Sequence, residues 1–153
     1  MEIGIISDIH GTLPEAAAQA LEGCDRIICA GDMGSVQTLW ELEAIAPTIA
    51  VRGNNDYGDQ WGPTVHFSAS PKLAGVRFFV VHRPNDIGIP ADDVQVVIHG
   101  HTHVPRDEQI NGIRYVNPGS VRYPRRNSRP SVARMAVEDG QVRSLRFIEL
   151  PVR

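Results

Sequence analysis

The chain has 153 residues, 42% of them hydrophobic, with 15 Lys and Arg against 18 Asp and Glu and a formal net charge of −3. This length and charge balance predict one globular domain over residues 1–153, without room for a second full domain and without general affinity for nucleic acid. The longest apolar runs, residues 27–30 and 94–98, are far below the roughly 20 residues of a membrane span. Residues 1–8 lack the pattern of a secretory signal, so we expect a cytoplasmic protein with no membrane partner.

The first half of the chain alternates short β-branched runs with stretches typical of helices. Thr12 and Glu15 are spaced as a capping box, with Pro14 in the first turn of the helix. Because strands that alternate with helices form parallel sheets covered by helices, we expect that arrangement here. The expected strands are residues 3–7, 26–30 and 48–51, and the expected helices are residues 12–23 and 36–46.

The second half is richer in β-structure. Asn111 and Gly112 lie between two strand-like runs, which is a strong β-hairpin signal, and residues 138–140 join two further runs. The fold class is therefore mixed α/β, most simply two β-sheets packed face to face with helices outside. The expected strands are residues 65–67, 76–82, 94–99, 108–110, 113–116, 131–137 and 141–150.

Seven residues that can bind metal ions follow the predicted strands, where loops converge on one edge of a sheet. Asp8 and His10 are two residues apart, so on an extended strand end their side chains point the same way and can share one ion. The two carboxylate oxygens of Asp32 suit it to bridge two cations about 3.5–4 Å apart. Nitrogen and oxygen donors without thiolate favour Mn, Fe, Co, Ni or Zn over Ca or Mg. The seven residues are Asp8, His10, Asp32, Asn54, His82, His101 and His103.

These residues also carry a resemblance to a known family. Five short motifs resemble, in the same order, the signatures of the calcineurin-like metallophosphoesterases, and the resemblance runs from Met1 to about Phe147. A late Asn-Pro-Gly-Ser stretch, residues 117–120, is similar to one in the small bacterial and archaeal phosphodiesterase branch. The five motifs are Asp8-Ile9-His10, Gly31-Asp32, Gly53-Asn54-Asn55-Asp56, His82 and Gly100-His101-Thr102-His103.

The resemblance implies a four-layer αββα sandwich of two mixed β-sheets flanked by helices. It also implies a dinuclear centre of two divalent transition-metal ions, for which Mn²⁺ is favoured and Fe, Ni, Co and Zn are alternatives. The implied reaction is hydrolysis of a small or activated phosphodiester by a metal-bridging hydroxide. The implied ligands are Asp8, His10 and His103 for one metal and Asn54, His82 and His101 for the other, with Asp32 bridging.

The sequence departs from the family pattern in two places. Many members have a His after the metal-binding Asn, whereas this chain has Asn55, which cannot act as a general acid near neutral pH. This change favours a diester with a good leaving group and leaves open which group protonates the leaving oxygen. Arg83 and Pro84 follow His82 where relatives usually have Gly, and residues 85–93 are too short for the helix that relatives often insert.

Other interpretations remain open at this point. A phosphomonoesterase or protein phosphatase is the alternative enzyme, and a non-catalytic interaction module, like the retromer subunit of this fold, is the alternative from another class. A small phosphoester substrate and a homo-oligomer are the expected partners. The arginines of residues 122–129 are interpreted as a solvated loop or an oligomer contact rather than a substrate clamp. We place His66 and His99 outside the metal centre and leave the role of Asp56 open.

Overall fold

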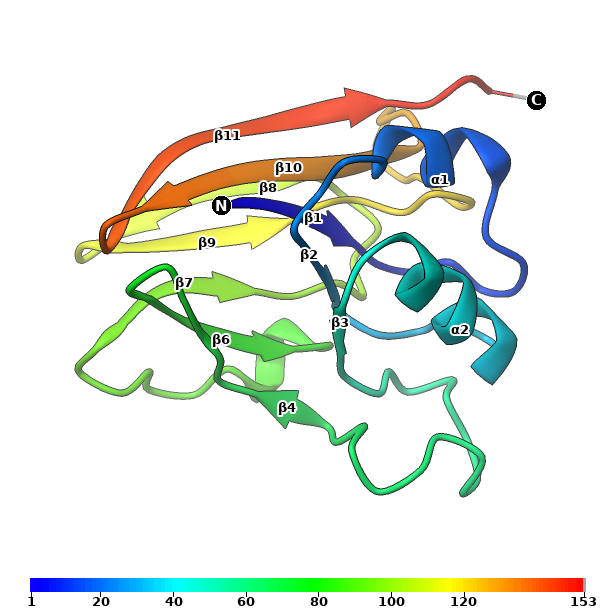
Figure 1. Ribbon diagram of the computed structural model, residues 1–153, viewed down its shortest axis with the longest axis horizontal. Helices are drawn as coiled ribbons and strands as arrows, with labels where there is room; N and C mark the ends of the chain where they lie inside the picture. The colour runs from blue at the N-terminus through cyan, green and yellow to red at the C-terminus, as the bar shows by residue number, and fades with distance from the viewer. Residues whose placement is uncertain (153) are drawn as a thin grey trace.

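Two β-sheets form the framework of the computed structural model, which describes residues 1–152. The strands of the first sheet are β1 (Glu2–Ile6), β2 (Arg26–Cys29), β3 (Thr48–Ala50), β10 (Ser131–Glu138) and β11 (Gln141–Glu149). Their order is β11-β10-β1-β2-β3, in which β1, β2 and β3 are parallel and β10 is antiparallel to both of its neighbours. Figure 1 shows β10 and β11 as a long hairpin along one side of the molecule.

The second sheet is built around a parallel centre. Its strands are β4 (Ser68–Ala69), β5 (Lys72–Leu73), β6 (Val76–Val81), β7 (Val94–Ile98), β8 (Arg106–Ile110) and β9 (Ile113–Asn117). The order is β4-β6-β7-β9-β8, and β5 also pairs with β6. Strands β6, β7 and β9 run parallel, while β4, β5 and β8 are antiparallel to their partners. The expected mixed α/β fold with two mixed sheets is confirmed.

The two α-helices lie against the first sheet. Helix α1 (Glu15–Ala20) packs on β10, and α2 (Val36–Ile45) packs on β3. The Ser35 hydroxyl begins α2 by accepting a hydrogen bond from the Thr38 amide. After β6 the chain forms one short 3₁₀ helix, η1 (Pro84–Asp86). Within residues 1–152, none of these helices has the length and apolar character that a bilayer crossing requires.

Apolar side chains form two cores, one on each face of the first sheet. Strand alternation sends Ile3 and Ile5 of β1 toward the second sheet, where they join Phe78 and Val80 of β6 in a fully buried cluster. Ile6 belongs to the cluster beneath the helices. Burial of a side chain of this size stabilises the fold by about 1.5–3 kcal/mol. Packing in the two cores therefore holds the first sheet against the second sheet on one face and against the helices on the other.

Two local expectations differ from the structure. The capping box at Thr12 is wrong, because the N-cap of α1 is Pro14 and no side chain caps the helix. The Thr12 carbonyl instead accepts a hydrogen bond from Arg122, so the residues before α1 belong to a loop. The strand expected at residues 65–67 contributes only one bridge, between Val51 and His66, and the paired strand begins at β4.

Candidate metal centre

The loops after β1 and β2 are joined by backbone hydrogen bonds. The amides of Asp8, His10 and Gly11 donate to the carbonyls of Gly31, Asp32 and Met33 at 3.0, 2.9 and 2.9 Å. Because β1 and β2 are parallel neighbours, both loops leave the same edge of the sheet. This pairing brings the side chains of the two predicted motifs together.

Five of the seven predicted ligands have a left-handed backbone conformation. Such conformations are uncommon for residues other than glycine, cost about 1–3 kcal/mol each, and gather at functional sites. Their φ angles lie between 52° and 74°. The surrounding fold therefore holds these loops in a strained arrangement that aims their side chains inward. The five residues are Asp8, His10, Asp32, His101 and His103.

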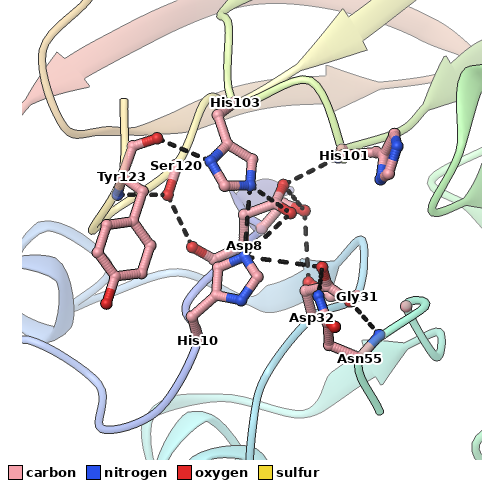
Figure 2. Close-up of polar contacts among 12 residues, drawn as sticks. Asp8, His10, Gly31, Asp32, Asn55, His101, His103, Ser120 and Tyr123 are labelled. Atoms are coloured by element: carbon pink, nitrogen blue, oxygen red, sulfur yellow. Dashed lines mark hydrogen bonds and ion pairs between the residues drawn. The ribbon is translucent and has the colours of Figure 1, made fainter. Parts of the chain in front are cut away.

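Asp8, His10 and His103 form the first close group of donors (Figure 2). The Nε2 atoms of His10 and His103 lie 3.7 and 3.2 Å from Asp8 Oδ1 and 3.3 Å from each other. His103 Nδ1 is 2.7 Å from the carbonyl oxygen of Tyr123, which can accept a hydrogen bond from it. That contact leaves Nε2 of His103 free to face a cation.

Asp8, Asp32 and His82 form the second close group. His82 Nε2 lies 3.2 Å from Asp32 Oδ2 and 3.7 Å from Asp8 Oδ1, and Nδ1 is 2.7 Å from the Ala30 carbonyl oxygen. Gly31 makes room for this ring, because a Cβ there would lie 2.8 Å from His82 Nδ1, and its φ of +99° also favours glycine. Asp8 and Asp32 therefore both reach the space between the histidines.

Asn54 and His101 lie beside the second group rather than inside either close set. Asn54 Oδ1 and His101 Nδ1 are 3.2 Å apart, and the rings of His82 and His101 are 5.3 Å apart with nearly perpendicular planes. The His101 amide donates to Asp8 Oδ2 at 3.0 Å. The structure thus brings all seven predicted residues to one place, between the loops after β1, β2, β3, β6 and β7.

Two polar atoms at the middle of the centre have no hydrogen-bond partner. Among residues 1–152, Asp8 Oδ1 and His82 Nε2 are the buried side-chain nitrogen or oxygen atoms that lack one. Buried polar groups are nearly always satisfied, so an exception needs an explanation. A carboxylate oxygen and an imidazole nitrogen are both atoms that can bind metal ions, and a bound divalent cation would satisfy them together.

The carboxylates and imidazoles shift each other's protonation. Burial raises the pKa of Asp8, but the contacts with His10 and His103, together with the charges of His82 and His103, lower it by more. The net pKa of Asp8 therefore lies below the ordinary range. Burial lowers the pKa of His82, yet the contact with Asp32 raises it to a net value above 6.5. The pKa of His103 is also raised, mainly by the close contact of its Nε2 atom with the Asp8 carboxylate. A cation at this centre would therefore take the place of protons that these histidines hold tightly.

Asp56, whose role the sequence left open, is a buried clamp between two loops. Its carboxylate accepts hydrogen bonds from the amides of Gly53, Asp32, Met33 and Gly34, at 2.8 to 3.4 Å. These contacts tie the loop that carries Asn54 to the loop that carries Asp32. The only signal in the sequence was an acidic residue three positions after Gly53, which equally fits an exposed turn.

Residues after β9 brace the loop after β1 from the second sheet. The Ser120 hydroxyl donates to the Asp8 carbonyl at 2.8 Å, and Arg122 donates to the carbonyls of Ile9 and Thr12 at 3.0 and 2.6 Å. Arg122 is therefore a structural brace, whereas Arg129 forms an exposed ion pair with Glu149. The expectation of a solvated loop or an oligomer contact is therefore wrong for Arg122, whose guanidinium binds backbone carbonyls of the loop after β1.

The two histidines placed outside the centre remain outside it. His99 is buried, and its ring nitrogens contact the Gly100 carbonyl oxygen at 3.0 Å and Arg106 at 3.1 Å. Burial lowers the pKa of His99, which favours a neutral ring. His66 is exposed.

Comparison with known proteins gives consistent matches over nearly the whole chain. A family model described as a calcineurin-like phosphoesterase superfamily domain matches residues 1–140. The chain is 32% identical over 151 residues to a protein of Methanothermobacter thermautotrophicus named "Probable metallophosphoesterase", covering 90% of this chain and 87% of that protein. It is 33% identical over 153 residues to the phosphodiesterase YfcE of Escherichia coli K12, covering 82% of each.

Solved structures share the fold. The structure of an archaeal phosphodiesterase has a TM-score of 0.81 at 27% identity, covering 98% of this chain and 100% of that chain. Vps29 of Entamoeba histolytica, solved with Zn²⁺, has a TM-score of 0.74 at 20% identity, covering 98% of each chain. The likeness to Vps29 is a likeness of fold alone.

Proposed function

Because the chain belongs to the calcineurin-like phosphoesterase superfamily, we propose that it is a metal-dependent phosphodiesterase that hydrolyses a small or activated phosphodiester. The observation that carries this proposal is the convergence of seven residues with nitrogen or oxygen donors, of which two buried donor atoms, Asp8 Oδ1 and His82 Nε2, have no hydrogen-bond partner. Two relatives, YfcE and the archaeal protein, are named phosphodiesterases, and these names support a diester rather than a monoester as the proposed substrate.

The donor set fits two divalent cations. Asp8, His10 and His103 would hold one, and His82 would hold the other with Asn54 and His101, the pair beside it. Asp32 is the proposed shared ligand, since its Oδ2 lies 3.6 Å from His10 Nε2 and 3.2 Å from His82 Nε2. Mn²⁺ is the ion we favour, with Fe, Co, Ni and Zn as alternatives. When bound, two such ions would supply an activated water molecule as nucleophile and would offset the charge on the phosphoryl oxygens.

Asn55 is suited to positioning rather than to proton transfer. Its backbone amide donates to Asp32 Oδ1 at 2.9 Å and its side-chain amide to Asp32 Oδ2 at 3.0 Å. A carboxamide does not release a proton near neutral pH, so it cannot protonate a departing oxygen. This arrangement holds the shared carboxylate in place and favours a leaving group that departs as a stable anion.

A non-catalytic role is the alternative that the fold permits, given the likeness to Vps29. The observation against it is the complete donor set with its supporting contacts. His82 and His103 each have Nδ1 beside a backbone carbonyl oxygen, which directs Nε2 at the carboxylates. A surface used only for protein contact would not require that orientation.

The test is hydrolysis of bis-p-nitrophenyl phosphate by the purified protein. We expect activity with Mn²⁺, its loss in a chelator, and its return when Mn²⁺ is restored. Asp32→Asn should lower kcat/KM by about 100-fold or more, since even residues that only support metal ligands contribute about 10–100-fold. Asp139→Asn, on the exposed turn between β10 and β11, is the matched control and should match the wild type.

Full activity in the chelator would contradict the proposal, as would an unaffected Asp32→Asn variant. Faster hydrolysis of p-nitrophenyl phosphate than of the diester would identify a phosphomonoesterase instead. A protein loaded with metal that hydrolyses neither ester would support the non-catalytic alternative.

A further inference from the structure

An open cavity adjoins one side of the metal centre. Its volume is about 400 Å³, within the range of small-molecule sites, and two proposed ligands, Asn54 and His82, form part of its wall. The aromatic rings of Phe67 and Phe79 line the part that lies beyond these ligands. A substrate whose phosphate sits at the metal centre could therefore extend one ester group into an aromatic-lined space.

The cavity follows from the alternation of side chains along β6. Phe78 and Val80 point into the core between the sheets, so Phe79 and Val81 face the opposite side. After His82 the chain forms only the short helix η1. One wall of the cavity thus comes from the face of the second sheet that lies away from the core between the sheets, and the loop after β3 forms another part of the lining.

Phe67 is held in position although its side chain is largely exposed. The residue is 65% exposed, and the guanidinium of Arg52 lies 5.0 Å from the ring centroid. That guanidinium is itself fixed by the carbonyls of Asp56 and Gly58, at 3.0 and 2.6 Å, and the Arg52 amide donates to the His66 carbonyl at 2.8 Å. The aromatic wall is therefore preorganised before any ligand arrives.

A positive charge stands at the same cavity. Arg83 lines it and is exposed, and its guanidinium has neither a hydrogen bond nor an ion pair with any residue in the range 1–152. A guanidinium placed there can contact a phosphoryl oxygen in the bidentate manner that arginine favours.

We propose that this cavity binds a planar aromatic ring on the ester group that stays attached to phosphorus, with Phe67 as the stacking surface and Arg83 beside the phosphate. The inference rests on the proposed diesterase activity and deepens it. Hydrolysis adds the oxygen of water to phosphorus and breaks the bond to the other ester oxygen, so the aromatic substituent remains on the monoester product. The cavity suits the retained group because a guanidinium is not a proton donor for a leaving oxygen.

The experiment compares three diesters that share p-nitrophenolate as leaving group and carry methyl, phenyl or thymidine 5′ as the retained substituent. The measured quantity is the kcat/KM of each aromatic diester divided by that of the methyl diester, which removes effects on the metal centre itself. We expect Phe67→Ala to lower both ratios by about tenfold, the size of effect seen when a base-stacking aromatic residue is removed. Phe67→Tyr should restore them, because the aromatic ring is kept.

Trp40→Ala is the matched control, since Trp40 is an aromatic residue of α2 that is 60% exposed and does not line the cavity. It should leave the ratios unchanged. Calorimetry with thymidine 5′-monophosphate, the product of the thymidine diester, gives a second readout, and Phe67→Ala should weaken its binding by a similar factor.

Equal ratios in the wild type and Phe67→Ala, with normal diester hydrolysis, would overturn this inference alone. Failure of the metal-loaded wild type to hydrolyse any of the three diesters would overturn the proposed function and this inference with it.

Discussion

At the scale of single residues, backbone carbonyls select the atoms that face the metal centre. His82 Nδ1 contacts Ala30 and His103 Nδ1 contacts Tyr123, each at 2.7 Å, so both rings direct Nε2 toward Asp8. Neither carbonyl could be identified from the sequence, because Ala30 and Tyr123 lie 52 and 20 residues from their histidines. The convergence of these side chains was predictable, whereas the contacts that orient them were not.

We expect four histidines of the metal-free protein to titrate in two groups. The pKa values of His82 and His103 should lie above 6.5, and those of His99 and His101 below it. Protonated His82 and His103 stabilise the fold fully below pH 6.5, and this contribution is lost as the pH rises through their raised pKa values. The lowered pKa values of His99 and His101 have the opposite effect. The folded state favours their neutral rings, so the free energy of unfolding decreases as the pH falls below 6.5. Ring chemical shifts in NMR measure all four, and a common pKa near 6.5 would contradict the geometry.

Asp56 is the residue outside the seven whose replacement should matter most to the centre. In Asp56→Asn, an NH₂ group would meet backbone amides that need an acceptor, which leaves buried donors unsatisfied. We expect unfolding free energy to fall by about 1–3 kcal/mol and metal content to decrease. Urea denaturation and elemental analysis measure these effects, with Asp139→Asn as control. If Asp56→Asn kept the stability and the metal content of the wild type, the hydrogen bonds of Asp56 would not be needed to hold the two loops together.

At the scale of elements, the site is made by loops that follow parallel strands. The ligand motifs could be placed at strand ends because β1, β2 and β3 are short apolar runs that each end in polar residues. The form of those loops was not predictable. The capping box expected at Thr12 does not form, because the Thr12 carbonyl accepts a hydrogen bond from Arg122 and α1 begins after Pro14. This contact and the pairing between the loops after β1 and β2 join residues far apart along the chain, which local patterns do not predict.

Gly31→Ala tests how closely these loops must approach. A Cβ at Gly31 would lie 2.8 Å from both the Gly53 amide nitrogen and His82 Nδ1, so the loops must separate or the imidazole must move. We expect metal binding to weaken by at least about tenfold and stability to fall by more than about 1 kcal/mol. Gly23→Ala is the control, because Gly23 also has positive φ (+79°) but nothing within 4 Å of the added Cβ. Equal losses of metal affinity in the two variants would contradict the account.

At the scale of the whole molecule, the two sheets supply different ligands to one centre. Asp8 and Asp32 follow strands of the first sheet, while His82 and His103 follow strands of the second (Figure 1). The hydrogen bond from Ser120 to the Asp8 carbonyl links loops of both sheets directly. Hairpin and strand signals predicted two sheets, but how their edges meet depends on packing between distant side chains, which no local pattern in the sequence encodes.

The most direct test of this account is a crystal structure of the protein grown with Mn²⁺, with an anomalous difference map that locates the metal. We predict two peaks on either side of Asp32, one bounded by Asp8, His10 and His103 and the other by His82, His101 and Asn54. A single peak, or peaks only elsewhere on the molecule, would contradict the dinuclear centre on which the proposed hydrolysis depends.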